Sequence, residues 1–588
     1  MAIIRSVPNI VRVIAKGQAG ANGSNAAPIM TTRAALAAAT VGVSAAFYIV
    51  LGYAAAGDCG DPMLYIKRAS EPSHAGKVQS ADGYWFELAS DYSRPEYFGS
   101  KGDLSTNDRA ALNDADGYAY AKSIPLKVRA GHALASSLTF TAKVDFEGAG
   151  RLKPGASVRV AFSDRFTLNP HSYVFDLAAS GSGIDFDASL VSDGYSAKAG
   201  TERLTPMNFG AIGDNSTPCD AAATRCVYYC QKGGIEFFWP RGMFKFAAPF
   251  VVDLATALDR GFTMRGAGME RTILSMVGFT PDAGDPYYAM WVKVSGGTAG
   301  VQASAYCVHP KFCDFMVYSQ FNGCGIRWGR QDYTDALNEL IVEQVGSRNF
   351  FGTLSGHTST VAMEWNFVLN ARIWCIANTG THDAGYVSFT AYGTAMRYRQ
   401  ISFSEVHGSH GSANIAHHFT GGFNNSTSIY NSDCENTNYC VWSDVSTVVS
   451  ISFIGGTFNY YVKGVVDAGG SDNLLLNPSL NPSFVSTSDW YSTARTTSSG
   501  WTTRCADVTI IPFTDPVVGA TGVTKYNNRG RDLMMMIYTT SSTCTVAFWT
   551  GGTITIPASS VFSFPLTNSQ PFTLTYAAAI GYAFLPIA

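Results

Sequence analysis

The 588-residue sequence is poor in charged side chains, which make up 14% of it, against about 25% in ordinary soluble proteins. Lysine and arginine nearly balance aspartate and glutamate, so the formal net charge is only -3. The chain also lacks a long basic stripe interleaved with aromatic residues. Without such a stripe it has no electrostatic means of gathering a polyanion, so we expect no nucleic acid partner.

Several motifs of enzyme chemistry are missing as well. The sequence has no G-x-S-x-G nucleophile elbow, and its GAGMER run lacks the third glycine of a dinucleotide fingerprint. Its 12 cysteines form no C-x-x-C pair, which argues against a zinc ribbon and a thioredoxin-like site. The histidines between positions 407 and 418 complete no known metal-ligand spacing. We therefore expect no cofactor and no metal; buried thiols and disulfides both remain open.

One uncharged run, residues 34–56, is long enough to cross a hydrocarbon layer of about 30 Å. It is rich in alanine, glycine, serine and threonine, and it begins too far along the chain for an ordinary signal peptide. We therefore expect a buried helix or an oligomer contact there, and membrane association is not expected. Residues 1–33 carry basic but no acidic side chains, which suits a solvated arm or a docking peptide.

What the chain does contain is one short sequence motif that occurs twice. PEYFGSKGD (95–103) and PMNFGAIGD (206–214) share a proline, a phenylalanine, two glycines and an aspartate at identical spacing, and each precedes an alanine-rich stretch. Gly-Asp supplies a turn, the Ser/Thr/Asp cluster that follows supplies helix caps, and alanine favours a short helix. A helix at the start of a sheet covers unpaired backbone groups. We therefore expect a capping helix at two places.

Short apolar strands alternate with polar turns between residues 313 and 470, as in FMVYS, LIVEQ, ISFSEV and ISFIGG. Their starts recur roughly every 22 to 27 residues, with two turns skipped. Such a repeat is typical of a solenoid, because each coil buries its apolar face only against its neighbours. After about residue 470, β-branched and aromatic residues alternate between Gly/Ser/Asn turns, which predicts a small β-domain.

These motifs resemble the start of the pectate-lyase-like right-handed parallel β-helix found in bacteriophage tailspikes and tail fibres. The match is good over about 206–275 and fainter over 95–151. Residues 31–53 and 65–88 are similar to modules that attach spikes to the virion, and the C-terminal segment is similar to terminal modules of tail fibres. The resemblance implies an all-β fold, a right-handed parallel β-helix (solenoid) with an N-terminal virion-attachment module and a C-terminal β-domain.

The implied organisation has five parts. They are a docking arm (1–33), a virion-attachment module (34–92), a first capped β-segment (93–204), the β-helix body (205–470) and a C-terminal β-module for trimerisation or receptor binding (471–588). The resemblance also implies a homotrimer located in the virion. Its partners would be other virion structural proteins, through the N-terminal region, and a bacterial surface polysaccharide.

Carboxylates are the candidate catalytic residues, because glycosidic cleavage needs an acid and a base or nucleophile at a fixed separation. Adjacent coils lie about 4.8 Å apart, so coils of roughly 20 to 25 residues would stack acids that are distant in sequence. The candidate catalytic residues are Glu343, Glu364, Glu405 and Asp433. The candidate substrate-binding residues, as sugar-stacking faces and carboxylate clamps, are Trp328, Trp365, Trp374, Arg397 and Arg399. The alternative is scattered surface acids and tryptophans that fill the core.

The function we expect is that of a virion-attached phage spike or fibre subunit that binds host-surface polysaccharide. The sequence leaves open whether it also cleaves the polysaccharide, as a depolymerase of the glycoside hydrolase or lyase type. One alternative is a non-catalytic structural or decorative virion fibre of the neck or tail. A second is a bacterial membrane-tethered polysaccharide lyase.

Overall fold

The chain forms two compact units, Met1–Ile212 with Ala221–Phe238, and Gly213–Asp220 with Trp239–Ala588. The computed structural model describes residues 28–186, 203–255, 261–277, 288–296, 305–320, 323–330, 335–350, 360–382, 389–390, 393–410, 413–421, 424–444, 448–467, 470–471, 473–476, 479–481, 491–493, 501–504, 524–526, 533–539, 541–548, 552–566, 571–577 and 581–586. The predicted docking arm therefore lies almost entirely outside the described residues, and the five-part division remains a proposal.

The first unit begins with a five-stranded sheet of order β1-β2-β3-β5-β4. Its strands are β1 (Ile29–Met30), β2 (Phe47–Val50), β3 (Met63–Arg68), β4 (Lys77–Gln79) and β5 (Trp85–Leu88). The apolar run 34–56 is not one buried helix: it contributes most of the short helix α2 (Arg33–Ala38), capped by Thr32, and strand β2. Among the described residues, no helix is long and apolar enough to span a membrane.

The first copy of the repeated motif, residues 95–103, begins a coil that is capped by a helix. The 3-10 helix η1 (Pro95–Phe98) leads into β6 (Asp103–Asn107) and α3 (Arg109–Lys122), and α3 contacts β7, β8 and β9. Three parallel three-stranded sheets follow. Their other strands are β7 (Leu126–Val128), β8 (Gly131–Leu134), β9 (Leu138–Phe140), β10 (Val144–Phe146), β11 (Arg151–Pro154), β12 (Arg159–Phe162), β13 (Phe166–Thr167) and β14 (Gly183–Phe186). The expected helix over a sheet is confirmed here.

Glu87 ties the N-terminal sheet to α3. Its carboxylate accepts hydrogen bonds from Arg68 on β3, from Nε2 of His74 at 2.8 Å and from Nζ of Lys122 on α3 at 2.7 Å. Burial alone would raise the pKa of Glu87, but the bonds from Lys122, His74 and Arg68 outweigh it and lower the pKa. Tyr118 of α3 adds a hydrogen bond to the carbonyl of Leu88, so the sheet and the capped coil are joined by several polar contacts.

The second copy has the same local geometry as the first. Its elements are β15 (Arg203–Leu204), η3 (Pro206–Phe209), β16 (Asp214–Pro218), α5 (Asp220–Gly233), β17 (Glu236–Trp239) and β18 (Gly242–Lys245). Gly99 and Gly210 follow the two 3-10 helices at φ 92° and 98°, a left-handed conformation that suits glycine. Asp103 and Asp214 each accept hydrogen bonds from the residues two and three positions later. The predicted duplication is therefore confirmed.

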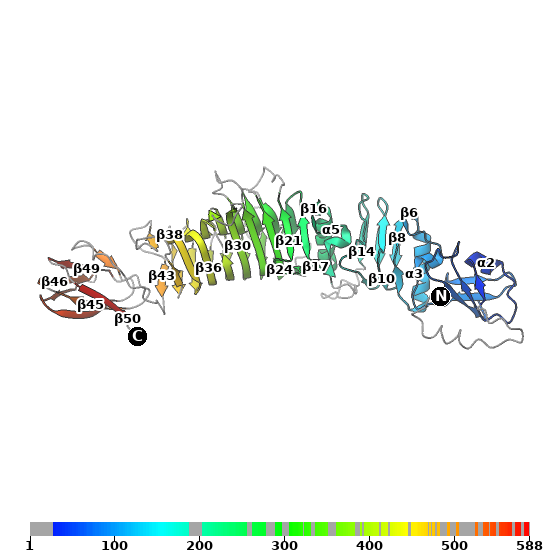
Figure 1. Cartoon of the computed structure of the whole chain (residues 1–588), viewed down its shortest axis with the longest axis horizontal. Coiled ribbons are helices and arrows are strands. Elements are labelled where there is room, and N and C mark those ends of the chain that lie inside the picture. The colour runs from blue at the N-terminus through cyan, green and yellow to red at the C-terminus, as the bar shows by residue number, and fades with distance from the viewer. Residues whose placement is uncertain are drawn as a thin grey trace. The chain divides into compact units, whose positions relative to one another are not determined.

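The second unit contains the β-helix, whose strands stack side by side (Figure 1). We group its parallel pairings into three faces, A, B and C. Face A comprises β19 (Phe250–Asp253), β22 (Tyr288–Lys293), β25 (Cys324–Trp328), β28 (Val361–Trp365), β32 (Thr394–Tyr398), β35 (Ile415–Phe419), the last part of β36 (Asn424–Ser443), the end of β38 (Thr457–Asp467) and β42 (Tyr491–Thr493). Face B comprises β23 (Ala305–Val308), β26 (Asp335–Asn338), β29 (Val368–Leu369), β33 (Ile401–Ser402), the starts of β36 and β37 (Val448–Ile454), and β39 (Gly470–Ser471).

Face C holds the longest strands. It comprises β18, β20 (Phe262–Gly266), β21 (Thr272–Met276), β24 (Pro310–Ser319), β27 (Ile341–Phe350), β30 (Arg372–His382), β34 (Glu405–His410), the middle of β36, the end of β37, the start of β38, β40 (Asn473–Leu476), β41 (Ser479–Asn481) and β43 (Trp501–Arg504). The short β31 (Phe389–Thr390) pairs antiparallel with the end of β30. The predicted right-handed parallel β-helix is confirmed.

Coil length varies more than the predicted repeat. One coil takes 33 residues between Glu364 and Arg397, but only 23 between Ser402 and Asn425. In the two coils that run from Arg327 to Glu364 and from Glu364 to Arg397, the extra residues lie between β27 and β28 and between β30 and β32. As a consequence, Glu343 and Glu364 belong to the same coil, and the prediction that they stack one above the other was wrong.

The corner between faces B and C is marked by residues in the left-handed conformation. On successive coils this column consists of His309, Glu339, Asn370, Phe403, Ser426 and Ser450. A positive φ turns the chain sharply, at a cost for residues other than glycine and asparagine. The column therefore sets the point at which each strand of face C begins.

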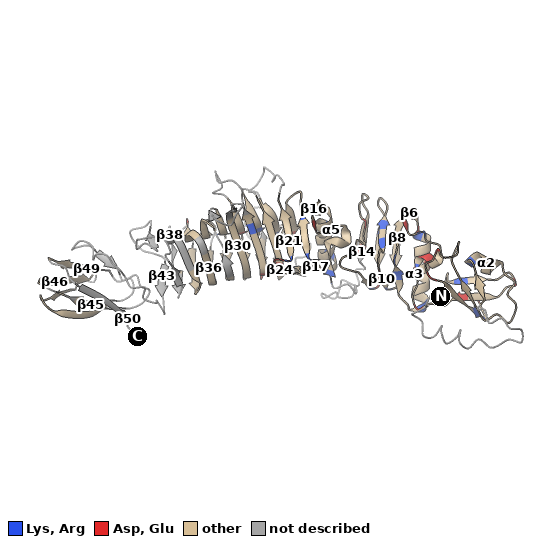
Figure 2. Cartoon of the chain, in the orientation of Figure 1, with Lys and Arg blue, Asp and Glu red and all other residues tan. Residues whose placement is uncertain are grey.

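Stacked apolar side chains fill the interior of the β-helix. Trp328 and Trp365 are both fully buried and stack with ring centroids 5.4 Å apart, and Tyr398 stacks on Phe419 at 4.7 Å. Figure 2 shows how few charged residues lie on these strands, as the low charge of the sequence predicts.

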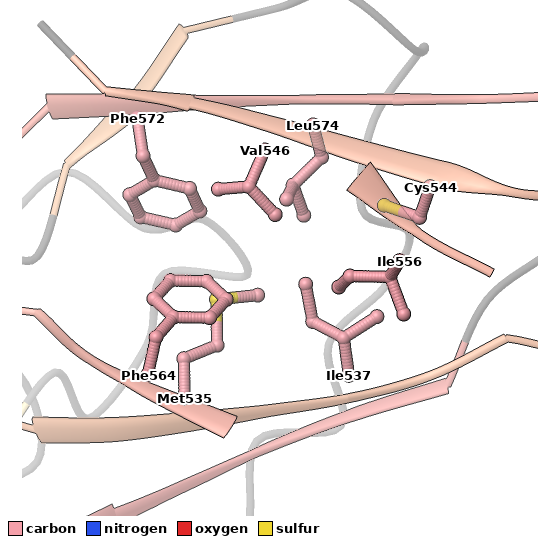
Figure 3. Packing of buried hydrophobic residues seen from close by; sticks show 8 residues of the cluster. All are labelled: Met535, Ile537, Cys544, Val546, Ile556, Phe564, Phe572 and Leu574. Carbon is pink, nitrogen blue, oxygen red and sulfur yellow. The ribbon is translucent and has the colours of Figure 1, made fainter. Parts of the chain in front are cut away.

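The C-terminal segment forms two antiparallel sheets, of order β44-β49-β46-β47 and β48-β45-β50. The strands are β44 (Thr524–Tyr526), β45 (Leu533–Tyr538), β46 (Cys544–Phe548), β47 (Thr553–Ile556), β48 (Val561–Leu566), β49 (Pro571–Tyr576) and β50 (Gly581–Pro586). Apolar side chains from both sheets meet between them (Figure 3), among them Met535, Ile537, Val546 and Phe572. The predicted small β-domain is confirmed.

Candidate functional site

Face C carries a row of aromatic rings on successive coils. Trp374 of β30 pairs in register with His407 of β34, and His407 pairs with Tyr430 of β36. The Trp374 side chain is 50% exposed, and the rings of His407 and Tyr430 stack at 4.7 Å with their planes 11° apart. Parallel strands at a spacing of about 4.8 Å turn residues far apart in sequence into a continuous surface.

A fourth aromatic residue, Phe403, lies at the corner beside this row. It is 60% exposed although its φ is 53°, a conformation that is unfavourable for a bulky residue. The equivalent position one coil earlier is Asn370, which tolerates this conformation better. An exposed ring held in a strained backbone is a reason to look for a function. We call the set Trp374, Phe403, His407 and Tyr430 the aromatic face.

Charged side chains border the aromatic face. Glu343 of β27 is paired in register with Trp374. Its carboxylate forms an ion pair with Nζ of Lys311 at a distance of 2.8 Å. Glu405 is paired in register with the exposed Arg372, and its carboxylate lies 3.9 Å from Nε2 of His407. The surface therefore combines flat apolar rings with hydrogen-bonding groups of both signs.

The four predicted catalytic acids are not brought together. Glu343 and Glu405 both lie on face C, but two coils and two residues along the strand separate their backbones, which corresponds to about 12 Å. Asp433 belongs to a later coil, beyond the bend of β36 at Asn431. Glu364 lies on face A. The carboxyl pairs of glycosidases are about 5 to 9.5 Å apart, so the backbone register alone does not supply such a pair.

Glu364 is 1% exposed and is surrounded by guanidinium groups. Oε1 lies 3.1 Å from Nε of Arg327, and Oε2 lies 3.3 Å from Nη1 of Arg397 and 3.2 Å from Nε of Arg399. Burial raises the pKa of Glu364, but the charges of Arg327, Arg399 and Arg397 outweigh it and lower the pKa. The group is a fixed carboxylate at neutral pH, which does not suit a general acid. The predicted carboxylate clamp of Arg397 and Arg399 exists, but it holds the protein's own Glu364.

The three predicted sugar-stacking tryptophans separate into two kinds. Trp328 and Trp365 are both fully buried and stack on each other, so the prediction that they contact a substrate was wrong. Their alternation along face A points them into the core, where large rings fill the space between coils. Trp374 alone of the three is exposed, and its role in binding stays a prediction.

Sequence reasoning missed Phe403, His407, Tyr430 and Arg372 as surface neighbours of Trp374. Their common surface depends on the register of coils of unequal length, which the sequence repeat did not give. One motif in the sequence could have indicated this surface, namely ISFSEVH (401–407). In it the buried residues Ile401 and Ser402 are followed by Phe403 and Glu405 on either side of a serine.

Other chemistry has little support within the described part of the chain. No group of three or more His, Cys, Asp or Glu side chains there is arranged to hold a metal ion. The described cysteines are buried and free of disulfide bonds. Burial raises the pKa of the Cys59, Cys219 and Cys324 thiols to about 12, which makes them poor nucleophiles.

Comparison with known proteins gives only distant structural similarities. No protein-family model and no curated protein matches the chain. It is similar to the A-module of the mannuronan C-5 epimerase AlgE6 of Azotobacter vinelandii, at 12% identity and a TM-score of 0.32, over 47% of this chain and 70% of that one. The strand register described above, rather than this similarity, establishes the β-helix.

Two tailspike structures show similarities of the same kind. The tailspike protein of Acinetobacter baumannii phage AM24 is 8% identical, with a TM-score of 0.23 over 92% of this chain and 81% of that one. Full-length tailspike protein 2 from an Escherichia coli O157:H7 bacteriophage is 9% identical, with a TM-score of 0.20 over 99% and 80%.

Proposed function

We propose that the chain is a subunit of a virion-attached spike or fibre that binds host-surface polysaccharide on the aromatic face. The observation that carries this proposal is the exposure of Trp374 and Phe403 on adjacent coils, beside the stacked rings of His407 and Tyr430. Exposed rings at regular spacing offer flat surfaces to the C–H faces of successive sugars. Arg372, Glu343 and Glu405 lie where they would hydrogen-bond sugar hydroxyl groups.

The rest of the chain is consistent with a particle-bound role. The proposal assigns residues 34–92 to attachment to other virion proteins and the C-terminal β-domain to trimerisation or receptor binding. A homotrimer would bury apolar side chains that one chain leaves exposed, such as Val43 and Val561. These assignments rest on the resemblance of the repeated cap and the flanking segments to phage spikes.

The test is a binding assay with the full-length protein and a panel of purified bacterial capsular polysaccharides and lipopolysaccharides. We expect one member of the panel to bind, and Trp374→Ala to weaken that binding about tenfold or more, because a ring and its contact area are lost. Tyr120→Ala is the matched control, since Tyr120 is 66% exposed on α3 in the other unit. Equal loss in both variants would contradict the assignment of the face.

The same assay separates the alternatives. A decorative neck or tail fibre predicts no binding to any member of the panel, together with a position on the particle away from the host-contacting end, seen by electron microscopy. A membrane-tethered lyase predicts that the protein is recovered with membranes rather than with particles, and that unsaturated sugar products are released.

A further inference from the structure

Face A carries a row of polar side chains that the proposed function does not use. Arg327, Glu364, Arg397 and His418 occupy the same register position on four successive coils. The next residue on each strand belongs to the stacked interior, formed by Trp328, Trp365, Tyr398 and Phe419. Because side chains alternate along a strand, the polar row faces away from that interior.

Glu364 is the only carboxylate recorded in contact with the three arginines among the described residues. Its Oε1 also accepts a hydrogen bond from Nδ2 of Asn366 at 2.9 Å, so both oxygens are occupied. Arg397 and Arg399 each donate one hydrogen bond to Oε2 of Glu364, whereas Arg327 lies at ion-pair distance from Oε1 without a hydrogen bond. A guanidinium group has five N–H donors. Most of the donor capacity of Arg397 and Arg399 is therefore not used by this carboxylate.

Positive charge is in excess at this site. Three guanidinium groups meet one carboxylate, and guanidinium groups do not lose their protons in proteins. Burial lowers the pKa of His418, and the charges of Arg397 and Arg399 lower it further, although Asp444 opposes them with a 2.7 Å hydrogen bond. Three arginines face two carboxylates, Glu364 and Asp444, so one positive charge remains without a partner. Uncompensated charge away from water is costly.

Several buried nitrogen atoms of this cluster, as the structure describes it, make no hydrogen bond, which shows where a negatively charged partner would fit. In the part of the chain that the structure describes, Nη2 of Arg327, Nε of Arg397 and Nδ1 of His418 are buried without a hydrogen-bond partner. The Arg327 side chain is 1% exposed, whereas those of Arg397 and Arg399 are 18% and 23% exposed. The cluster thus has a closed inner end at Arg327 and reaches solvent at Arg397 and Arg399.

Aromatic residues border the row at both ends. The Arg327 guanidinium lies 5.6 Å from the ring centre of Tyr288 and 5.8 Å from that of Trp291. At the other end, Nε1 of Trp442 donates a hydrogen bond to Asp444, the partner of His418. Rings that flank a charged centre suit a ligand with apolar and anionic parts, as in a sugar acid.

We propose that this arginine cluster is a binding site for the carboxylate of an acidic sugar, a uronic acid residue of the polysaccharide. The carboxylate would accept hydrogen bonds from Arg397 and Arg399, whose planar donor groups match it in geometry. The ligand class rests on the proposed function, but the site lies on face A, whereas the aromatic face lies on face C. Acid recognition here and ring stacking there are therefore separable by mutation.

The experiment is isothermal titration of the full-length protein at constant ionic strength with D-glucuronate, D-glucose and inorganic phosphate. We expect glucuronate to bind and glucose to show no heat, because glucose lacks the carboxylate. Arg399→Gln should weaken glucuronate binding about tenfold or more, since a charge-assisted hydrogen bond is lost. Arg399→Lys keeps the charge and should retain part of the affinity. The matched control is Arg348→Gln, an exposed arginine of β27 that lies 3.7 Å from Glu270.

Each outcome bears on the proposal. Absence of glucuronate binding, or equal weakening by Arg348→Gln and Arg399→Gln, would overturn it and leave a structural ion-pair cluster. Phosphate binding in preference to glucuronate would overturn the sugar-acid assignment. Trp374→Ala should leave glucuronate binding unchanged while it weakens polysaccharide binding. If Trp374→Ala has no effect on the polysaccharide but Arg399→Gln abolishes glucuronate binding, the aromatic face fails and the acid site stands.

Discussion

Trp328 and Trp365 lie one coil apart inside the β-helix, with their ring planes 5° from parallel and their centroids separated by 5.4 Å. Only nine residues after Trp365, Trp374 is half exposed on face C. The same residue type therefore stabilises the coil stack at one position and forms part of the proposed binding surface at another. The two roles lead to opposite expectations for mutagenesis.

Trp328→Ala should destabilise the β-helix by about 3–5 kcal/mol, because it removes a fully buried ring and leaves a cavity under Trp365. Trp374→Ala should cost less than about 1 kcal/mol. Unfolding in guanidinium chloride, followed by tryptophan fluorescence and circular dichroism, measures both changes. Similar losses from the two substitutions would show that the exposure of Trp374 has been misjudged.

Phe403→Asn should stabilise the protein and weaken its binding. Asparagine tolerates the left-handed conformation at φ 53°, so we expect a gain of up to about 1 kcal/mol. Loss of the exposed ring should weaken polysaccharide binding by up to about tenfold. Thermal unfolding and the binding assay measure the two effects. Phe403→Tyr retains the ring and should change neither, so a loss of binding in that variant would count against a stacking role.

Glu87→Gln should destabilise the first unit by about 1–3 kcal/mol at pH 7, since three bonds to a buried carboxylate lose their charge. The folded pKa of Glu87 is lowered from its ordinary value of 4.5. Its contribution is therefore present above that value and disappears as the pH falls through the folded pKa. Unfolding measured from pH 7 to pH 3 should show the difference between wild type and variant shrinking below about pH 4.5.

The control for this variant is Glu71→Gln. Glu71 is 54% exposed and is paired with Lys77, so its substitution should have little effect at any pH. A difference for Glu87→Gln that persists unchanged at pH 3 would rule out the charge as its cause.

The two cap aspartates should behave alike. The backbone N–H groups of Thr106 and Ser105 lower the pKa of Asp103, and those of Thr217 and Ser216 lower the pKa of Asp214. Asp103→Asn and Asp214→Asn should each lower the melting temperature at neutral pH, and the effect should fade below the ordinary carboxyl pKa of 3.8. Asp164→Asn is the control, because the hydrogen bond that Asp164 accepts comes from the backbone of its immediate neighbour Arg165. A large effect at one cap and none at the other would argue against equivalent roles.

If the chain cleaves the polysaccharide that it binds, Glu343 and Glu405 are the exposed carboxylates of the aromatic face to test. Glu343→Gln or Glu405→Gln should then lower the rate by about a hundredfold or more and keep binding within a few-fold. New reducing ends would indicate a hydrolase and unsaturated products a lyase. Glu339→Gln, an exposed partner of His309 in the corner column, is the control. Wild-type rates in both test variants would remove these residues from the chemistry.

The sequence was sufficient for features encoded by local spacing. The repeated P-x-x-F-G-x-x-G-D pattern predicted both caps, and alternating apolar residues predicted the small C-terminal β-domain. It was insufficient for the surface, because the register of Glu343, Trp374 and Glu405 depends on coils whose lengths differ by ten residues. Composition also does not tell a buried Trp365 from an exposed Trp374, because the first points into the interior from β28 and the second points outward from β30.

The variation in coil length has an evolutionary consequence. The three faces keep their pairing across coils of 33 and of 23 residues, since the additional segments enter between strands and not within them. Recombination that exchanges those segments would therefore leave the register of the three faces and the interior stack intact. The fold can thus take up segments of new sequence at these positions without passing through an unstable intermediate.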